Sequence, residues 1–460
     1  MKFSTLLHYL TFVPFDTQTV QGQQQERYRR AAWSVIADIV SKASGMAVMV
    51  MSVTLTLPYL GEERFGVWMT IASFAGMLTF LDLGIGNALT NHIAKAVTHD
   101  RHETLSSAIS GGLGLMLLVG VVMALILIVI ASQLPWQSLI KVKDTVLYDE
   151  IRIACMWFAG LFGLNLFTSS IMRVFSGLQQ AYYGHIAASV GSWLALVALW
   201  WLTQKHAGIS ILLIVSLGAQ SLSGLFLLGL LIQKKLLLAR GIFRAIGREY
   251  KVLFHSGSLF FILQIGCMIG WGADSLIISA TLGASQVAVY NVTQRLFQFV
   301  SQPLAMMNAP LWAAYADAHA RHDSEFIKKT LKRSLFLTLG SAILGAIILL
   351  SIGQQVIEIW TKGSIFSPLL FIAVMGVWTI IDSVGNSFAM LMNGCHIVKP
   401  QMMSVLIFCM LTIPIKFLFV YEYGLVGIIV ATILVYIISV PIFYAIFFRA
   451  VILDTIRQPN

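Results

Sequence analysis

Charged residues are scarce in this chain of 460 residues. Asp, Glu, Lys and Arg make up 11% of it, whereas apolar residues make up 58%. An ordinary globular chain is about 25% charged and 45–50% apolar. So few charges cannot cover the surfaces of the two or three soluble domains that this length would otherwise suggest. Most of the outer surface is therefore expected to face lipid.

Cysteine is also rare, and the four cysteines follow no pairing pattern. Cys155, Cys267, Cys395 and Cys409 all lie in or beside apolar runs, and no CxxC occurs. A disulfide framework or a cysteine metal site is therefore not expected. We interpret these residues as small packing residues of the interior.

The motifs of nucleotide-driven pumps and of common hydrolases are absent. Because the sequence has no Gly-Lys dipeptide, it has no P-loop, and HExxH and GxSxG are missing as well. The longest stretches between apolar segments, 233–253 and 313–332, are too short to fold into a catalytic domain. The sequence therefore predicts a protein that is not an enzyme and needs no cofactor. Any transport should draw on an ion gradient or on the gradient of the substrate itself.

Apolar runs long enough to cross a bilayer recur along the whole chain. A spanning helix needs about 20 mostly apolar residues. The predicted spans are 31–58, 66–89, 106–133, 151–176, 184–203, 209–232, 254–283, 286–312, 333–359, 366–394, 402–421 and 425–448. A tight turn at residues 421–423 separates the last two. The predicted fold is an all-α polytopic membrane protein with about twelve transmembrane helices.

Lys and Arg in the predicted loops fall mostly on the side of the N-terminus, which indicates that this side is cytoplasmic. The N-terminal stretch has no apolar core with a cleavage site, so we do not expect a secretory signal. The formal charge of +10 matches anionic membrane lipids and requires no nucleic acid. Both termini are predicted to be cytoplasmic, in a bacterial inner membrane. The predicted divisions are an N-terminal extension (1–30), a six-helix bundle (31–232), a basic cytoplasmic linker (233–253), a second six-helix bundle (254–448) and a cytoplasmic tail (449–460).

An internal repeat relates the two halves. LGEERFGVW at 60–68 and LGASQVAVY at 282–290 share their pattern of Leu-Gly, polar or small residues, Val and aromatic at an offset of 222 residues. Each motif joins the first two predicted spans of its half. Six helices per half, starting on the same side, predict parallel repeats about an axis along the membrane normal. Transporters commonly bind substrate between such repeats.

Ionisable residues inside the spans are costly in a bilayer and are candidates for function. Asp38 and Lys42 are four positions apart on one helix face and should neutralise each other. Asp274 and Arg295 lie at similar depths on adjacent helices, so we expect them to pair. Either pair could be structural or functional. Lys416 is expected to extend toward the interface rather than to be buried.

Two further aspartates have no partner nearby in the sequence. Asp382 is the best isolated candidate for a proton-titrating group, and Asp82 is either a coupling residue or an interfacial cap. The candidates for ion coupling are thus Asp382, Asp274, Asp38 and Asp82. Histidines lie in predicted loops or near span ends, where we interpret them as solvated, including the His-Asp pairs at 99–100 and 322–323.

Several segments carry a resemblance to a known family. LGEERFGVWMTIASFAGMLTFLDLGIGNALTNHIAK (60–95), DSLIISATLGASQVAVYNVTQRL (274–296), PLWAAYADA (310–318) and NGCHIVKPQ (393–401) are similar to polysaccharide biosynthesis proteins. These belong to the multidrug/oligosaccharidyl-lipid/polysaccharide exporter superfamily, and FGVW followed by LDLGIGNAL resembles its O-antigen (Wzx-type) flippases.

The resemblance implies translocation of an undecaprenyl-pyrophosphate-linked oligosaccharide from the cytoplasmic to the outer leaflet. It also implies a cationic lumen between two bundles, for which Arg295, Lys42 and Lys416 are the candidate substrate-binding residues. Membrane lipids and the polysaccharide polymerase machinery are the other implied partners. Two alternatives remain: an ion-coupled drug/cation antiporter of the same fold, which would use the intramembrane aspartates, and a membrane-embedded glycosyl polymerase or ligase. A polymerase or ligase of this kind usually has a large external loop, and the longest outer stretch here, 134–150, is short, which disfavours the enzyme.

Overall fold

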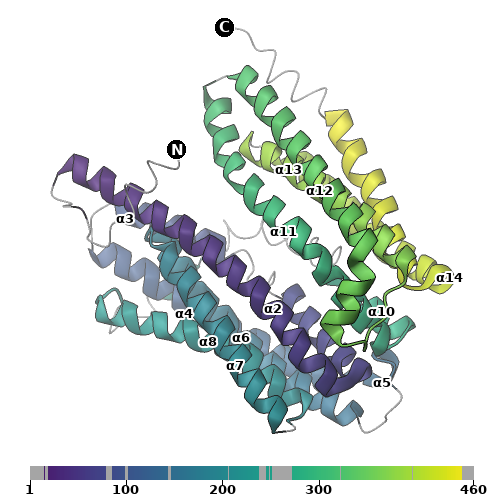
Figure 1. The fold of residues 1–460 in the computed structure, drawn as a ribbon. Helices are drawn as coiled ribbons and strands as arrows, with labels where there is room; N and C mark the ends of the chain where they lie inside the picture. The colour runs from purple at the N-terminus through teal and green to yellow at the C-terminus, as the bar shows by residue number, and fades with distance from the viewer. Residues whose placement is uncertain are drawn as a thin grey trace. The chain divides into compact units, whose positions relative to one another are not determined.

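A computed structural model describes residues 15, 19–78, 85–98, 102–142, 147–205, 207–237, 245–247, 249–250, 272–321, 323–395 and 397–447, and the elements below refer to this part of the chain. Its elements are helices α2 (Val20–Leu78), α3 (Ile85–Thr98), α4 (His102–Gln133), α5 (Trp136–Leu139), α6 (Leu147–Gly177), α7 (Ala181–Gln204), α8 (Ile209–Gln233), α10 (Asp274–Thr281), α11 (Ala284–Ala320), α12 (Ser324–Thr361), α13 (Leu369–Gly394) and α14 (Val398–Phe447) (Figure 1).

Several described helices coincide with predicted spans, and others begin earlier or end later than predicted. Eight helices of the described part are long and apolar enough to cross a membrane, and α7 matches the predicted span 184–203. Helix α2 begins at Val20, whereas the first predicted span begins at residue 31. Most of the predicted span 254–283 lies outside the described residues. These helices make the chain a multi-pass helical membrane protein.

The two longest helices each contain a glycine that breaks the helical conformation. Gly61 in α2 has φ of 73°, and Gly424 in α14 has φ of 58°. Both angles lie in the left-handed region, which glycine adopts without steric cost. The break in α14 comes directly after Tyr421–Tyr423, where the turn between the last two spans is predicted. Each of these long helices therefore contains parts of two predicted spans.

The two repeat motifs use their glycines in the same way. Gly61 and Gly283 occupy the same position in 60–68 and 282–290, and both have positive φ, 73° and 96°. At each glycine one helical segment ends and the next begins. A glycine with positive φ at the same position of both motifs supports the predicted repeat, beyond the similarity of the two sequences.

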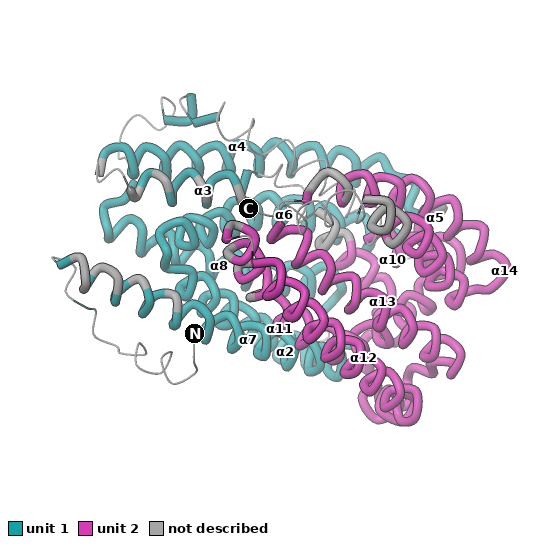
Figure 2. The backbone as a smooth tube through the Cα atoms, turned by 90° about the horizontal axis from the view of Figure 1, so that it is seen from above, with its two compact units in different colours: residues 1–56, 78–136, 144–264 teal, residues 57–77, 137–143, 265–460 magenta. Residues whose placement is uncertain are grey.

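The chain forms two compact units (Figure 2). Unit 1 contains residues 1–56, 78–136 and 144–264, and unit 2 contains 57–77, 137–143 and 265–460. Unit 2 therefore includes the second half of α2, which the prediction assigned to the first bundle. The predicted bundle boundaries otherwise remain a prediction.

Unit 1 is built around α6. This helix packs against both α4 and α8, and a buried apolar cluster of α3, α4, α6 and α8 includes Leu89, Met116, Phe175 and Leu231. Glycines bring α4 and α6 close together, because a Cβ at Gly120 would lie 2.4 Å from the backbone oxygen of Gly163. Such small-residue contacts are typical of helix packing in membranes.

Unit 2 has α11, α12 and α13 in mutual contact, running side by side (Figures 1 and 2). A buried polar group joins these three helices. The Asn308 side chain donates to Thr338 Oγ1 (3.2 Å) and Ser387 Oγ (2.9 Å) and accepts from Ser334 Oγ (3.1 Å). Hydrogen bonds of this kind hold helices together where lipid gives no hydrophobic driving force.

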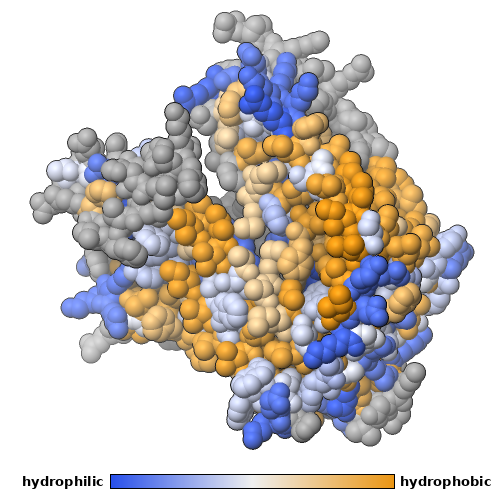
Figure 3. All heavy atoms as spheres, viewed as in Figure 1, coloured by the Kyte–Doolittle hydropathy of each residue, from blue (hydrophilic) through white to orange (hydrophobic). Residues whose placement is uncertain are grey.

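The outer faces of the helices are apolar, as a lipid-facing surface requires. On the face shown in Figure 3, hydrophobic residues cover the middle of the helices of unit 2, and hydrophilic residues gather near their ends. Phe336 and Ile359 on α12 and Met410 on α14 are among the exposed large apolar residues. At the start of α12, the Asp323 carboxylate accepts the backbone N–H of Phe326, so this aspartate of the 322–323 pair is a helix cap.

Candidate functional site

Asp274 and Lys416 form a buried ion pair in unit 2. Asp274 is the first residue of α10, and Lys416 lies inside α14 with no exposed surface. Lys416 Nζ donates to Asp274 Oδ1 at 2.5 Å, and Tyr290 Oη of α11 donates to Asp274 Oδ2 at 2.6 Å. Both carboxylate oxygens thus have a partner, so the pair satisfies its charges inside the unit.

This geometry corrects two sequence predictions. Among the described residues, the ion pair of Asp274 is with Lys416 and not with Arg295. Lys416 does not extend to the interface, because its ammonium is buried against the carboxylate. An isolated charge in a bilayer is far more costly than a paired one, which accounts for the buried position.

Arg295 is the one candidate cation that has no carboxylate partner among the described residues. It lies on α11, and its Nη2 contacts the Met69 thioether sulfur at 3.3 Å; Met69 belongs to the second half of α2, in the same unit. Its Nη1 is buried and has no hydrogen-bond partner within the described part of the chain. Buried donors are normally satisfied, so this guanidinium has the capacity to bind an anionic acceptor.

Asp38 and Lys42 pair in unit 1, as their spacing on one helix predicts. Lys42 Nζ lies 2.7 Å from Asp38 Oδ2. The structure adds His185 of α7, whose Nδ1 lies 3.5 Å from Asp38 Oδ1. All three side chains keep about a third of their surface exposed. The sequence placed His185 near a span end and gave no signal that it meets Asp38.

Asp382 lies on α13 and is partly buried. No hydrogen bond or ion pair to its carboxylate comes from the residues that the structure describes. One turn further on, the side-chain oxygen of Asn386 is buried and also lacks a partner there. Asp382 thus differs from Asp38 and Asp274, each of which has a lysine beside it. Asp82 lies outside the described residues.

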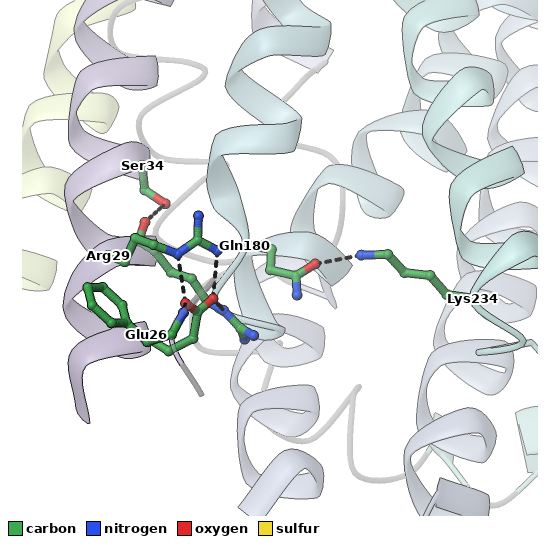
Figure 4. Close-up of polar contacts among 7 residues, drawn as sticks. Glu26, Arg29, Ser34, Gln180 and Lys234 are labelled. Atoms are coloured by element: carbon green, nitrogen blue, oxygen red, sulfur yellow. Dashed lines mark hydrogen bonds and ion pairs between the residues drawn. The ribbon is translucent and has the colours of Figure 1, made fainter. Parts of the chain in front are cut away.

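A second ionic cluster lies in the first turns of α2. Glu26 accepts from Arg29 through two bonds of 2.7 Å and from Arg30 at 2.9 Å (Figure 4). Hydrogen bonding to Arg29 is the main reason that the pKa of Glu26 falls to about 2. One carboxylate therefore accepts from two guanidinium groups. The described residues contain no group of three or more His, Cys, Asp or Glu side chains placed to bind a metal ion.

Comparison with solved structures gives the class of fold. An inward-facing multidrug resistance MATE family transporter of the MOP superfamily has a TM-score of 0.71, at 15% identity over 89% of this chain and 99% of that chain. The lipid II flippase MurJ, in an inward closed conformation, has a TM-score of 0.68, at 14% identity over 90% of this chain and 87% of that chain. The chain therefore has the fold shared by these membrane transporters.

Sequence comparison gives the family. The model of the polysaccharide biosynthesis protein family matches residues 28–312, and the chain belongs to this family. It is 20% identical to a "Putative O-antigen export protein" of Yersinia pseudotuberculosis, over 90% of this chain and 94% of the relative. It is 22% identical to a "Putative O-antigen transporter" of Salmonella typhi, over 88% and 94%.

Proposed function

We propose that the protein is a flippase that moves an undecaprenyl-pyrophosphate-linked oligosaccharide from the cytoplasmic to the outer leaflet by alternating access. Its family, its O-antigen relatives and the fold that it shares with a lipid II flippase support this function. On this proposal the protein is a transporter and not an enzyme. It lies in the bacterial inner membrane with both termini in the cytoplasm and supplies the polysaccharide polymerase machinery.

The residue that carries the proposal is Arg295. A diphosphate cannot enter hydrocarbon unaided, because removing water from its charges is prohibitively costly. A fixed guanidinium substitutes for that water, and its planar fork donates two hydrogen bonds at once to phosphate oxygens. Arg295 has a buried Nη1 without a partner in the described part and an Nη2 held only by a thioether. Both nitrogens can therefore turn to a phosphate at little cost.

Lys42 and Lys416 contribute differently. Lys42 remains partly exposed beside Asp38, so it can exchange this partner for a substrate phosphate. Lys416 is already paired with Asp274 in a buried ion pair. We therefore propose that Lys416 mainly holds α14 to α10. As a substrate contact it ranks below Arg295 and Lys42.

Coupling to an ion gradient is assigned first to Asp382. Its carboxylate has no fixed cation within the described part of the chain, so a proton or a sodium ion can serve as its partner. Asp38, with His185 beside it, is a second candidate. Asp274 ranks below both because Lys416 and Tyr290 satisfy it, and Asp82 remains a candidate on its sequence position alone.

The alternative is an ion-coupled drug/cation antiporter, which the MATE-like fold favours. A cationic drug would need carboxylates free to receive it. Lysines neutralise Asp38 and Asp274, so only Asp382 of the described intramembrane aspartates is available. This charge pattern favours an anionic substrate.

The test is complementation of a deletion strain by Arg295→Gln, which keeps a polar side chain and removes the charge. We expect loss of the surface polysaccharide at a normal amount of membrane-inserted protein. Arg333→Gln, an exposed position on α12, is the matched control and should complement fully. Near-normal polysaccharide with Arg295→Gln would contradict the role of Arg295.

A further inference from the structure

In unit 1, the end of α6, the start of α7 and the end of α8 lie together, and aromatic and cationic side chains meet at this place. α6 ends at Gly177, residues 178–180 turn the chain into α7, and α8 ends at Gln233. We call Phe175, Gln180, Tyr182, Tyr183 and Lys234 the turn cluster. By the predicted topology it lies on the cytoplasmic side, where Lys234 begins the basic linker.

Lys234 is the centre of the cluster. Its Nζ lies 4.9 Å from the centre of the Tyr183 ring and 5.7 Å from that of Phe175, and it donates to Gln180 Oε1 at 2.9 Å. Figure 4 shows Gln180 and Lys234 pointing toward each other from different elements. Aromatic faces attract an ammonium ion but do not neutralise it. The residues that the structure describes provide no carboxylate for Lys234.

Two neighbouring tyrosine rings, tilted against each other, lie beside this charge. The rings of Tyr182 and Tyr183 have centroids 4.5 Å apart at an interplanar angle of 30°, and both side chains are partly exposed. The Arg29 guanidinium lies near both tyrosine side chains. Arg29 and Arg30, which both pair with Glu26, add two further cationic side chains on this side of the cluster.

Two backbone positions beside the cluster are unusual. Gln179 has φ of 58° and Lys235 has φ of 54°, which is the left-handed region that side chains disfavour. Both residues end a helix: the N–H groups of Gln180 and Leu236, which follow them, donate to the backbone oxygens of Phe175 and Leu231. A lysine at a helix C-terminus is favoured by the helix dipole, but the dipole explains neither the tyrosine surface nor the bond to Gln180.

We propose that the turn cluster binds the phosphate-bearing headgroup of a lipid at the cytoplasmic surface. The exposed ammonium of Lys234 receives a phosphate oxygen, and the apolar face of a sugar or a glycerol moiety lies on the tyrosine rings. Two lipids offer this chemistry: the polyprenyl-diphosphate substrate and an anionic phospholipid. The substrate reading rests on the proposed function and would make the cluster its docking site before translocation.

Binding to purified protein in detergent tests the proposal without requiring transport. The probes are undecaprenyl pyrophosphate, phosphatidylglycerol and, as a neutral-headgroup control, phosphatidylcholine. The variants are Lys234→Gln and Tyr183→Leu. Lys205→Gln is the matched control, because Lys205 is also an exposed lysine that caps a helix C-terminus, that of α7. Unchanged thermal midpoints establish that each variant is folded.

We expect Lys234→Gln to weaken binding of the diphosphate lipid about 10- to 100-fold, because the hydrogen bond that it removes is charge-assisted. Tyr183→Leu should weaken it less, and Lys205→Gln should leave it unchanged. Loss confined to undecaprenyl pyrophosphate identifies the substrate, and an equal loss of phosphatidylglycerol identifies an anionic phospholipid. Unchanged affinity for both lipids in both cluster variants would overturn the proposal. That result would not decide the flippase function, which the phenotype of the deletion strain tests independently.

Discussion

Single charged residues in this protein fall into two groups by what surrounds them. Asp274, Lys416 and Tyr290 satisfy one another inside unit 2. Arg295 and Asp382 have no oppositely charged partner in the described part of the chain. A satisfied pair mainly determines how helices pack, whereas a charge without a partner is available to a substrate or an ion. This difference, and not charge alone, ranks the candidate site residues.

The buried pair leads to a prediction about stability. Removing one partner leaves an uncompensated buried charge, which costs about 3–5 kcal/mol, whereas removing both often costs much less. We therefore expect Asp274→Asn and Lys416→Met each to lower the thermal midpoint strongly, and the double variant to lower it less than the sum. Thermal unfolding in detergent measures all four proteins. Strictly additive losses would show that the two side chains do not interact.

Glu26 gives a prediction about pH. Its pKa falls from 4.5 to about 2 on folding, so its ion pairs stabilise the protein above pH 4.5 and lose that effect as the pH falls toward 2. Glu26→Gln should therefore lower the thermal midpoint by a constant amount between about pH 5.5 and 8. A difference that shrinks within this window would mean that the carboxyl titrates there and is not held by Arg29.

The sequence predicted which helices carry Arg295 and Asp274 but not the side of the helix on which each residue lies. Arg295 and Asp274 do lie on adjacent helices, yet Tyr290 is the α11 residue that reaches Asp274. Five positions along a helix correspond to a rotation of about 140°, so Arg295 faces away from the residue that Tyr290 meets. The buried position of Lys416 and the contact of His185 with Asp38 were not predicted, because both partners come from segments far away in the chain.

Helices in this protein bend and pack at glycines. Gly61, Gly283 and Gly424 adopt positive φ where one helical segment gives way to the next. Gly66 allows the second half of α2 to approach the start of α11, because an added Cβ would lie 1.8 Å from the backbone oxygen of Ala284. This contact joins the two repeat motifs within unit 2. The apolar runs and the Leu-Gly pattern predicted the helices and their breaks, but no sequence signal reveals that the motifs touch.

Gly66→Ala should therefore destabilise the protein. Backbone atoms cannot rotate away from the new methyl group, and overpacking of this kind costs about 1–3 kcal/mol or more. Gly340→Ala on α12 is the matched control, since nothing lies within 4 Å of its added Cβ. There the lost flexibility should stabilise the helix by about 0.5–1 kcal/mol. The measurement is the thermal midpoint of each variant relative to the wild type. Equal shifts for Gly66→Ala and Gly340→Ala would contradict the close contact at Gly66.

At the scale of the whole molecule, lipid is the solvent for most of the surface, and the few charges are concentrated at helix ends or in specific intramembrane groups. The scarcity of charge and the recurring apolar runs were sufficient to predict a multi-pass helical fold. The family match then places the chain among polysaccharide biosynthesis proteins. Composition could not do so, because a flippase and a drug antiporter share the same apolar helices.

Leaflet distribution of the lipid-linked oligosaccharide in a deletion strain tests the flippase function most directly. An impermeant probe added to intact spheroplasts labels only the outer leaflet, and total extraction gives the cytoplasmic remainder. Loss of the surface polymer, with the oligosaccharide accumulating on the cytoplasmic leaflet and both reversed by the wild-type gene, is the result that the flippase function predicts. An unchanged surface polymer would contradict it and favour the antiporter; accumulation on the outer leaflet would contradict it and indicate a defect in polymerisation or ligation.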